Sequence, residues 1–151
     1  MSVYERLTHA GVRLPDARPP VANYVPWVMS GNLLFVSGQV SITPDGLIKG
    51  RLGDDMTLEQ GQAAARWCAI NLLAQMHAAL GDLERVTRVV KLGGFVSATK
   101  DFVEIPKVVN GCSDLMVEIF GDKGRHARFA VACPVLPLGA AVEVDAVVEF
   151  R

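Results

Sequence analysis

The chain has 151 residues, half of which are hydrophobic, and 21% of its residues are charged. This balance is typical of a folded globular protein and argues against disorder. A net charge of −1, a pI near 6.3 and the lack of any run of basic residues argue against a nucleic-acid partner. The length predicts one domain, spanning residues 1–151.

The chain contains no apolar run close to the roughly 20 residues that a membrane helix needs, so we expect no membrane association. The N-terminus lacks the long apolar segment of a signal peptide. The three cysteines are odd in number and show no Cys-x-x-Cys spacing, which argues against a disulfide framework. We therefore expect the protein to be cytoplasmic.

The first forty residues predict a short helix followed by a β-hairpin. Ser2 can cap a helix over residues 2–11, and the proline-rich stretch that follows cannot continue it. We expect residues 1–20 to form an N-terminal extension that packs on the domain. Residues 22–29 and 33–40 are apolar segments around a Ser-Gly-Asn turn, and they predict two paired strands.

The middle of the chain predicts a loop, a long helix and a strand. Residues 43–55 are rich in turn-forming residues and predict a surface loop. Thr57 begins a Thr-x-x-Gln capping box, and the apolar spacing after it predicts a helix over residues 58–80. Residues 86–96 are rich in β-branched side chains and predict a strand, in which the Gly93-Gly94 pair indicates a bulge or a close backbone approach.

Residues 102–120 predict a second helix with Pro106 in its first turn, and two apolar segments near the C-terminus predict strands. The order of elements is then ββ-α-β-α-ββ. This order predicts an α+β fold with one mixed β-sheet and two helices packed on one face.

The last two strands carry the charges that single out a candidate site. Side chains alternate between faces along a strand. In residues 142–150 the even-numbered positions are apolar and predict the core face, which leaves Glu143 and Asp145 on the other face. We expect the preceding strand to form a hairpin with this one and to place its larger apolar residues in the core: Phe129, Val131 and Cys133. Arg128, the only charge in that preceding strand, would then share the non-core face with Glu143.

Two interpretations of Arg128 stay open on these grounds. Ala130 and Ala132 flank it and leave space above the sheet, so its planar guanidinium can bind a carboxylate ligand through two hydrogen bonds. Alternatively, Arg128 forms a structural salt bridge with Glu143 or Asp145. Because the same face mixes apolar and charged residues, we also expect a homo-oligomer packed through it, with Arg128 near a subunit boundary.

A set of short motifs resembles the reactive intermediate deaminases, the Rid or YjgF-like family. The motifs have the order and spacing of that family from residue 20 or so to residue 150. They are Asn23-Tyr24-Val25, Phe35-Val36-Ser37-Gly38-Gln39, Asn110, Ala127-Arg128, Leu136-Pro137 and Val142-Glu143-Val144-Asp145-Ala146. The combination is specific because Glu143 follows Arg128 by fifteen residues, as in the family pattern.

The resemblance implies a chorismate-mutase-like fold and a homotrimer with active sites between subunits. It implies an enzyme of metabolite damage control that hydrolyses reactive 2-imino acids, of the 2-aminoacrylate type, to 2-keto acids and ammonia. Such a reaction requires no cofactor and no metal. Water attacks the imine carbon, while one group orients the substrate carboxylate and another handles the proton.

By the same resemblance, Arg128 matches the arginine that binds the substrate carboxylate, and Glu143 matches the glutamate that positions the attacking water. Further substrate-binding positions are Tyr24, Ser37, Gly38, Asn110 and Ala130. The sequence departs from better-known members after the arginine, where Phe129 and Ala130 replace a small polar residue and a cysteine. We therefore expect a divergent subgroup with an altered pocket.

Two other functions stay open. Some members of this family are described as endoribonucleases or translation inhibitors, although this sequence has no basic stripe or histidine pair to support RNA cleavage. A non-catalytic small-molecule-binding protein could use the same inter-subunit cleft.

His126 lies two residues from Arg128 and could reach the site. No cluster of His, Cys, Asp or Glu has the spacing of metal ligands.

Overall fold

The computed structural model describes residues 1–20 and 22–151, and its main sheet has five strands in the order β1-β2-β7-β5-β6. These strands are β1 (Trp27–Ser30), β2 (Leu33–Val40), β5 (Val86–Ser97), β6 (Ala127–Cys133) and β7 (Val142–Phe150). Neighbouring strands are antiparallel except β5 and β6, which run parallel. At the start of the predicted loop, a separate short hairpin consists of β3 (Ile42–Thr43) and β4 (Gly46–Leu47). The predicted α+β class and mixed sheet are confirmed.

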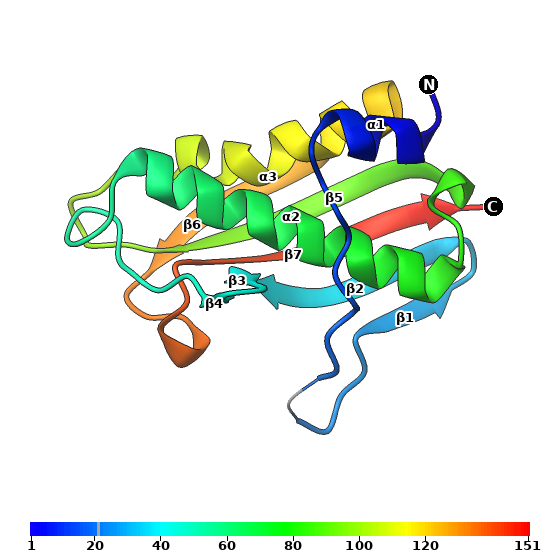
Figure 1. Cartoon of the computed structure of the whole chain (residues 1–151). Coiled ribbons are helices and arrows are strands. Elements are labelled where there is room, and N and C mark those ends of the chain that lie inside the picture. The colour runs from blue at the N-terminus through cyan, green and yellow to red at the C-terminus, as the bar shows by residue number, and fades with distance from the viewer. Residues whose placement is uncertain (21) are drawn as a thin grey trace.

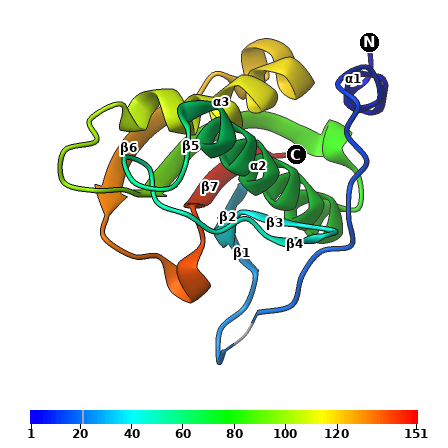
Figure 2. The same cartoon turned by 60° about the vertical axis from the view of Figure 1, so that its left-hand side comes forward.

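Two long helices cover one face of the sheet. They are α2 (Leu58–Leu80) and α3 (Ile105–Phe120), which lie side by side over the strands (Figures 1 and 2). The other helical segments are α1 (Val3–His9) and the 3-10 turns Leu83–Arg85, Gly121–Gly124 and Pro137–Gly139. No helix of the described residues is both long enough and apolar enough to cross a membrane. The buried apolar core lies between α2, α3 and the sheet.

Helix α2 begins and ends where the sequence predicts. Thr57 Oγ1 accepts a hydrogen bond from the Gln60 N–H at 3.1 Å, and Gln60 Oε1 accepts one from the Thr57 N–H at 2.9 Å. This capping box satisfies two N–H groups that the helix itself cannot pair. Gly81 follows the last turn in the left-handed conformation, with φ of 76°, which glycine adopts without a steric penalty.

Helix α3 begins at Ile105, later than the predicted start at Phe102. The Phe102 N–H instead donates to the Thr99 carbonyl at 3.2 Å, which closes a turn before the helix. Pro106 then occupies the first helical turn, as predicted. Its missing N–H costs nothing there, because the first N–H groups of a helix have no partner within the helix.

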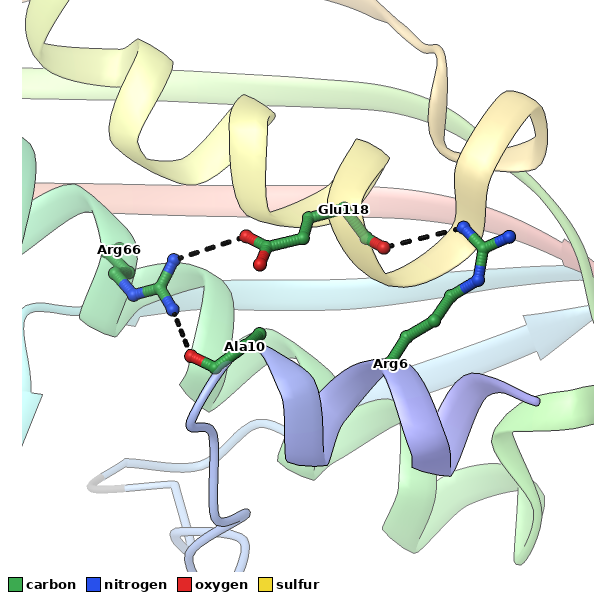
Figure 3. Close-up of polar contacts among 4 residues, drawn as sticks. All are labelled: Arg6, Ala10, Arg66 and Glu118. Atoms are coloured by element: carbon green, nitrogen blue, oxygen red, sulfur yellow. Dashed lines mark hydrogen bonds and ion pairs between the residues drawn. The ribbon is translucent and has the colours of Figure 1, made fainter. Parts of the chain in front are cut away.

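The N-terminal segment is bonded to both long helices (Figure 3). Ser2 caps α1 through a capping box, so the predicted first helix is confirmed. The Arg66 guanidinium of α2 donates to the Ala10 carbonyl at 2.9 Å and lies 3.7 Å from Glu118 Oε2 of α3. Arg6 of α1 donates to the Glu118 carbonyl at 3.5 Å. These contacts join α1, α2 and α3 on the side of the molecule away from the sheet.

The predicted hairpin between the last two strands is wrong. Strand β5 lies between β6 and β7, because Leu92 of β5 pairs with Arg128 on one side and with Ala146 on the other. The connecting segment 134–141 passes the end of β5, where the Ser97 N–H donates to it at 2.9 Å. The proline and glycine residues of this segment suggest a hairpin turn in the sequence. In the structure the segment instead crosses the end of β5 to connect β6 with β7.

The inserted strand reverses the predicted faces of β6. Residues in register share a face, so Arg128 lies on the helix-covered face together with the buried Leu92 and Ala146. The three residues predicted for the core lie instead on the face away from α2 and α3, here named the open face: Phe129, Val131 and Cys133. Phe129 is 37% exposed and Val131 is 41% exposed.

The open face carries aromatic and acidic side chains. Phe95 of β5 and Phe129 of β6 pack edge to face, with ring centroids 5.3 Å apart. In the register, Glu143 of β7 is paired with Phe95, and Asp145 lies two residues farther along β7 on the same face. The predicted alternation of β7 is therefore confirmed, since its even-numbered positions from Val142 to Val148 are buried.

Gly93 and Gly94 are positions of close approach and not a bulge. The register of β5 against β7 shifts nearer the start of the strand, within residues 86–91. A Cβ at Gly94 would lie 2.7 Å from Val109 Cγ1 of α3, and a Cβ at Gly93 would collide with the Phe129 ring on the open face. The pair therefore lets α3 approach the sheet from one side and lets Phe129 pack on the other.

Helices α2 and α3 also approach each other closely, which yields a prediction for Gly111→Ala. A Cβ at Gly111 would collide with the Gln62 backbone carbonyl of α2. Overpacking costs about 1–3 kcal/mol, and the backbone collision places this case at the upper end, above the ~1 kcal/mol that alanine gains in helix propensity. We expect a net loss of stability in urea denaturation.

The control for this prediction is Gly81→Ala. That glycine has a positive φ but nothing within 4 Å of an added Cβ, so it should lose only the roughly 1–2 kcal/mol of left-handed strain. A Gly111→Ala variant as stable as the wild type would contradict the close approach of the two helices.

Candidate active site

Arg128 projects from β6 toward α3, where it meets uncharged oxygen atoms. Its Nη1 donates to Asn110 Oδ1 at 2.9 Å and to Ser113 Oγ at 3.1 Å, and its Nη2 donates to the Pro106 carbonyl at 3.4 Å. All three contacts are made by Nη1 and Nη2, and no hydrogen bond of Nε is found among the described residues. Nε and Nη2 together form one edge of the guanidinium, and such an edge can bind a carboxylate with two parallel hydrogen bonds.

The alternative interpretation, a salt bridge from Arg128 to a carboxylate of β7, is wrong. Arg128 lies on the helix-covered face, whereas Glu143 and Asp145 lie on the open face. Within the part of the chain that the structure describes, the ion pairs are Arg66–Glu118 and Lys107–Glu104. The Arg128 charge therefore has no carboxylate partner among the described residues.

His126 extends the hydrogen bonds around Arg128. Its Nε2 lies 2.9 Å from Ser113 Oγ, and its Nδ1 lies 2.6 Å from the Gly124 carbonyl. Ser113 is not predicted as a site residue from the sequence. It follows Asn110 by three residues, and this spacing places two side chains on one face of a helix. These side chains form what we name the arginine cluster: Arg128, Asn110, Ser113 and His126.

Glu143 lies on the open face beside an irregular part of β2. The ladder between β2 and β7 is interrupted between Val36 and Gln39. Gly38 lies in this interruption, where an added Cβ would be 3.0 Å from Glu143 Oε2. Burial raises the pKa of the half-buried Glu143 carboxyl, and the Asp145 carboxylate raises it further. A shift in this direction brings the carboxyl closer to the pH at which it can exchange protons with a substrate or water.

Ser37 joins this region to the segment before β1. Its Oγ donates to the Val25 carbonyl at 2.8 Å, and its N–H donates to the Pro26 carbonyl at 2.9 Å. Tyr24, which precedes this anchored segment, is 49% exposed. We name these four residues of the region the glutamate cluster: Glu143, Asp145, Gly38 and the neighbouring Ser37.

Within one chain the two clusters lie on opposite faces of the sheet. The structure therefore brings Arg128 together with Asn110, and Glu143 together with Gly38, but it does not unite the two sets. Ala130 shares the helix-covered face with Arg128 and packs against the core. Within residues 1–20 and 22–151, no group of three or more His, Cys, Asp or Glu side chains is arranged to hold a metal ion.

Fold and sequence together define the class of this protein. Residues 4–150 match the profile of a family described as "YjgF/chorismate_mutase-like, putative endoribonuclease". The chain belongs to this family, and the predicted resemblance and chorismate-mutase-like fold are confirmed.

Individual relatives agree with this assignment. Protein TCP17 of Trypanosoma cruzi is 52% identical over 99% of this chain and 94% of its own length. RutC family protein y4sK of Sinorhizobium fredii is 32% identical over 89% of this chain and 93% of its own length. The crystal structure of the protein Atu1372, with unknown function, from Agrobacterium tumefaciens has a TM-score of 0.93 and 46% identity, covering 99% of this chain and 92% of that one.

The direction of the Glu143 pKa predicts a gain of stability in Glu143→Gln. A carboxyl whose pKa is higher in the folded state than in the unfolded state contributes its full stability below the unfolded pKa, about 4.3 for glutamate. That contribution is lost as the pH rises through the folded pKa. Glutamine does not ionise, so the variant should melt at a higher temperature than the wild type at pH 7.

The check is a series of thermal melts between pH 4 and pH 8, in which the gain should shrink toward pH 4. Glu59→Gln is the control, because Glu59 is exposed at the start of α2 and should give no such gain. A Glu143→Gln gain that is the same at every pH would show that the carboxyl charge is not its cause.

Proposed function

We propose that this protein is an enamine/imine deaminase that hydrolyses reactive 2-imino acids to 2-keto acids and ammonia. In the reaction, water adds to the imine carbon, the nitrogen gains protons, and the carbon–nitrogen bond breaks to leave a ketone and ammonia. For 2-aminoacrylate, tautomerisation to the imine comes first, and the product is pyruvate. The substrates are small anions with a carboxylate next to the reacting carbon.

The observation that carries this proposal is the Arg128 guanidinium, whose Nε makes no hydrogen bond among the described residues. Its charge has no carboxylate partner among the described residues, and uncharged oxygens on α3 hold one side of the guanidinium. An arginine held in this way is prepared to bind an external carboxylate without first breaking an ion pair. Asn110, beside it, supplies an amide whose remaining hydrogen-bonding groups can meet the substrate.

The proton-handling group that we propose is Glu143. Burial and Asp145 raise the pKa of its carboxyl, which suits a group that takes a proton from water and passes it to the leaving nitrogen. Gly38 exposes backbone beside it, and Tyr24 lies near the same end of β2. Because Glu143 and Arg128 lie on opposite faces of one chain, they can act on one substrate only if they come from different subunits.

We therefore propose a homotrimer with active sites between subunits. The open face supports it, because it exposes large apolar side chains from three strands: Phe35 of β2, Phe95 of β5, and Phe129 and Val131 of β6. Burying such a surface against other copies of the chain is favourable. It also allows the glutamate cluster of one subunit to approach the arginine cluster of the next. We place this trimer in the cytoplasm, a setting supported by the buried free thiols of Cys68 and Cys112.

The family description also contains the word endoribonuclease, and RNA cleavage is the main competing function. The net charge of −1 gives RNA phosphates no general attraction. Both ring nitrogens of His126, the histidine closest in sequence to Arg128, lie within hydrogen-bond distance of groups of the same chain. These features support the deaminase over the nuclease.

The test of this function is Arg128→Ala, assayed with 2-aminoacrylate generated in situ. Loss of a charge-assisted bidentate pair costs about 3 kcal/mol, so kcat/KM should fall by at least about 100-fold. Arg128→Lys keeps the charge but loses the planar fork. Its kcat/KM should lie between that of the wild type and that of Arg128→Ala. The measurement is the rate of ammonia release above the spontaneous rate.

Each competing function predicts another result. Deamination unchanged in Arg128→Ala would contradict the proposal. RNA cleavage that persists after removal of contaminating nucleases and after this substitution would favour the nuclease. Binding of 2-oxobutanoate by the wild type without ammonia release from any imine would indicate a non-catalytic binding protein.

Sites shared between subunits predict complementation between two inactive variants. In mixed trimers of Arg128→Ala and Glu143→Gln chains, some sites receive Arg128 from one chain and Glu143 from the other. Random mixing of equal amounts restores about a quarter of the sites in a cyclic trimer. The two proteins should be unfolded together and refolded, and the activity compared with that of each protein refolded alone.

Light scattering provides the control for that experiment, since the mixed sample must have three times the 16.2 kDa mass of one chain. A mixture no more active than its parts, in trimers of this mass, would mean that both residues act within one chain or that one of them does not act.

A further inference from the structure

Arg128 is the first member of a chain of hydrogen bonds that ends on the backbone. Its Nη1 donates to Ser113 Oγ at 3.1 Å. Ser113 Oγ lies 2.9 Å from His126 Nε2, and His126 Nδ1 lies 2.6 Å from the Gly124 carbonyl. Asn110 is the other partner of Nη1, and its bond to Arg128 is its only link to this series of hydrogen bonds.

The chemistry of the atoms determines the direction of each bond. A carbonyl oxygen only accepts, so the hydrogen of the neutral His126 ring lies on Nδ1 and points at Gly124. Nε2 then carries a lone pair and accepts the Ser113 hydroxyl proton. The Ser113 oxygen in turn accepts the Arg128 N–H. Each donor meets one acceptor only when the imidazole is neutral.

The surroundings favour that neutral ring. Burial lowers the pKa of the half-buried His126 imidazole, the hydrogen bond to the Gly124 carbonyl opposes this, and the Arg128 charge lowers it further. On the neighbouring strand, Lys91 has its ammonium over the Phe129 ring on the open face. On α3, Asp114 is exposed to solvent.

We propose that Ser113 and His126 are positioning residues that hold the Arg128 guanidinium with its Nε–Nη2 edge free for the substrate carboxylate. This inference rests on the proposed role of Arg128 as the carboxylate clamp. Ser113 holds Nη1 of Arg128. His126 accepts the Ser113 hydroxyl proton, so that the Ser113 oxygen directs a lone pair at Arg128. Neither residue touches the reacting carbon, so their loss should weaken substrate binding and leave the chemical step nearly unchanged.

Protonation of His126 should disturb the same series of hydrogen bonds, because Nε2 can then only donate to the Ser113 oxygen. An imidazolium Nε2 carries a hydrogen and no longer accepts the Ser113 proton. It also places a second positive charge near Arg128. We therefore expect carboxylate binding to weaken as the pH falls through the His126 pKa, which lies below its usual range.

The experiment combines a spectroscopic and a binding measurement. In the wild type, ¹⁵N NMR of the histidine rings at pH 7 should find His126 neutral, with its hydrogen on Nδ1. Calorimetric titration with 2-oxobutanoate as the probe should give a Kd about tenfold higher for Ser113→Ala, the effect of losing one modest hydrogen bond. Ser113→Thr keeps the hydroxyl and should restore wild-type binding, whereas His126→Phe should resemble Ser113→Ala.

Ser30→Ala is the matched control, because Ser30 is exposed on the edge strand β1. Its Kd should equal that of the wild type. In deamination assays, Ser113→Ala should raise KM about tenfold and keep kcat within about twofold. The decline of wild-type binding below neutral pH should be absent from His126→Phe, a result that a merely structural role would not produce.

The outcomes separate this inference from the function beneath it. If Arg128→Ala loses binding but Ser113→Ala binds as the wild type does, positioning by Ser113 is overturned and the clamp stands. A His126 ring that carries its hydrogen on Nε2, or is charged at pH 7, overturns it as well. If Arg128→Ala binds 2-oxobutanoate as tightly as the wild type, both proposals fail. Should Ser113→Ala not fold, the NMR result and His126→Phe decide the question.

Discussion

The parallel pairing of β5 with β6 is the constraint on which both clusters of the candidate site depend. It sets Arg128 in register with Leu92 and therefore directs the guanidinium under α3, where Asn110 and Ser113 bind it. The antiparallel pairing of β5 with β7 on the other side directs Glu143 to the opposite face. A hairpin of β6 with β7 would have no room for β5 between them. One long central strand thus decides which side chains of the candidate site can meet inside one chain.

Side-chain size on the sheet follows from how closely α3 approaches it. Gly94 faces Val109 of α3 at a distance that leaves no room for a Cβ, and Ala130 lies on the same face beside it. The large apolar residues of β6 are therefore on the open face, where Gly93 makes room for the Phe129 ring. The result inverts the usual pattern, in which the larger apolar side chains of a strand are turned toward the helices. It leaves aromatic side chains exposed on the open face.

The same inversion explains what the sequence can and cannot predict here. The ends of α2 are local features, because Thr57 and Gln60 satisfy each other and Gly81 needs no distant partner. The β1-β2 hairpin and the alternation of β7 are local for the same reason. The face of β6 is not local, since apolar residues lie on both of its sides and only the pairing with β5 decides which side faces the helices. Arg128 and Glu143 could therefore be chosen as candidates by motif, but their opposite orientations required the long-range register.

Opposite faces have a consequence for how such a site would be assembled. The arginine cluster is bonded within its own chain, through Ser113, His126 and the backbone of Gly124, so the proposed clamp would be organised before subunits assemble. The glutamate cluster lies on the surface that we propose to be buried in the trimer. Burial there removes more water from Glu143 and raises its carboxyl pKa further in the direction already set by desolvation and Asp145. Assembly would thus complete the site and at the same time bring its proton-handling group closer to neutral pH, whereas a lone chain would hold a prepared clamp without a partner for the chemistry.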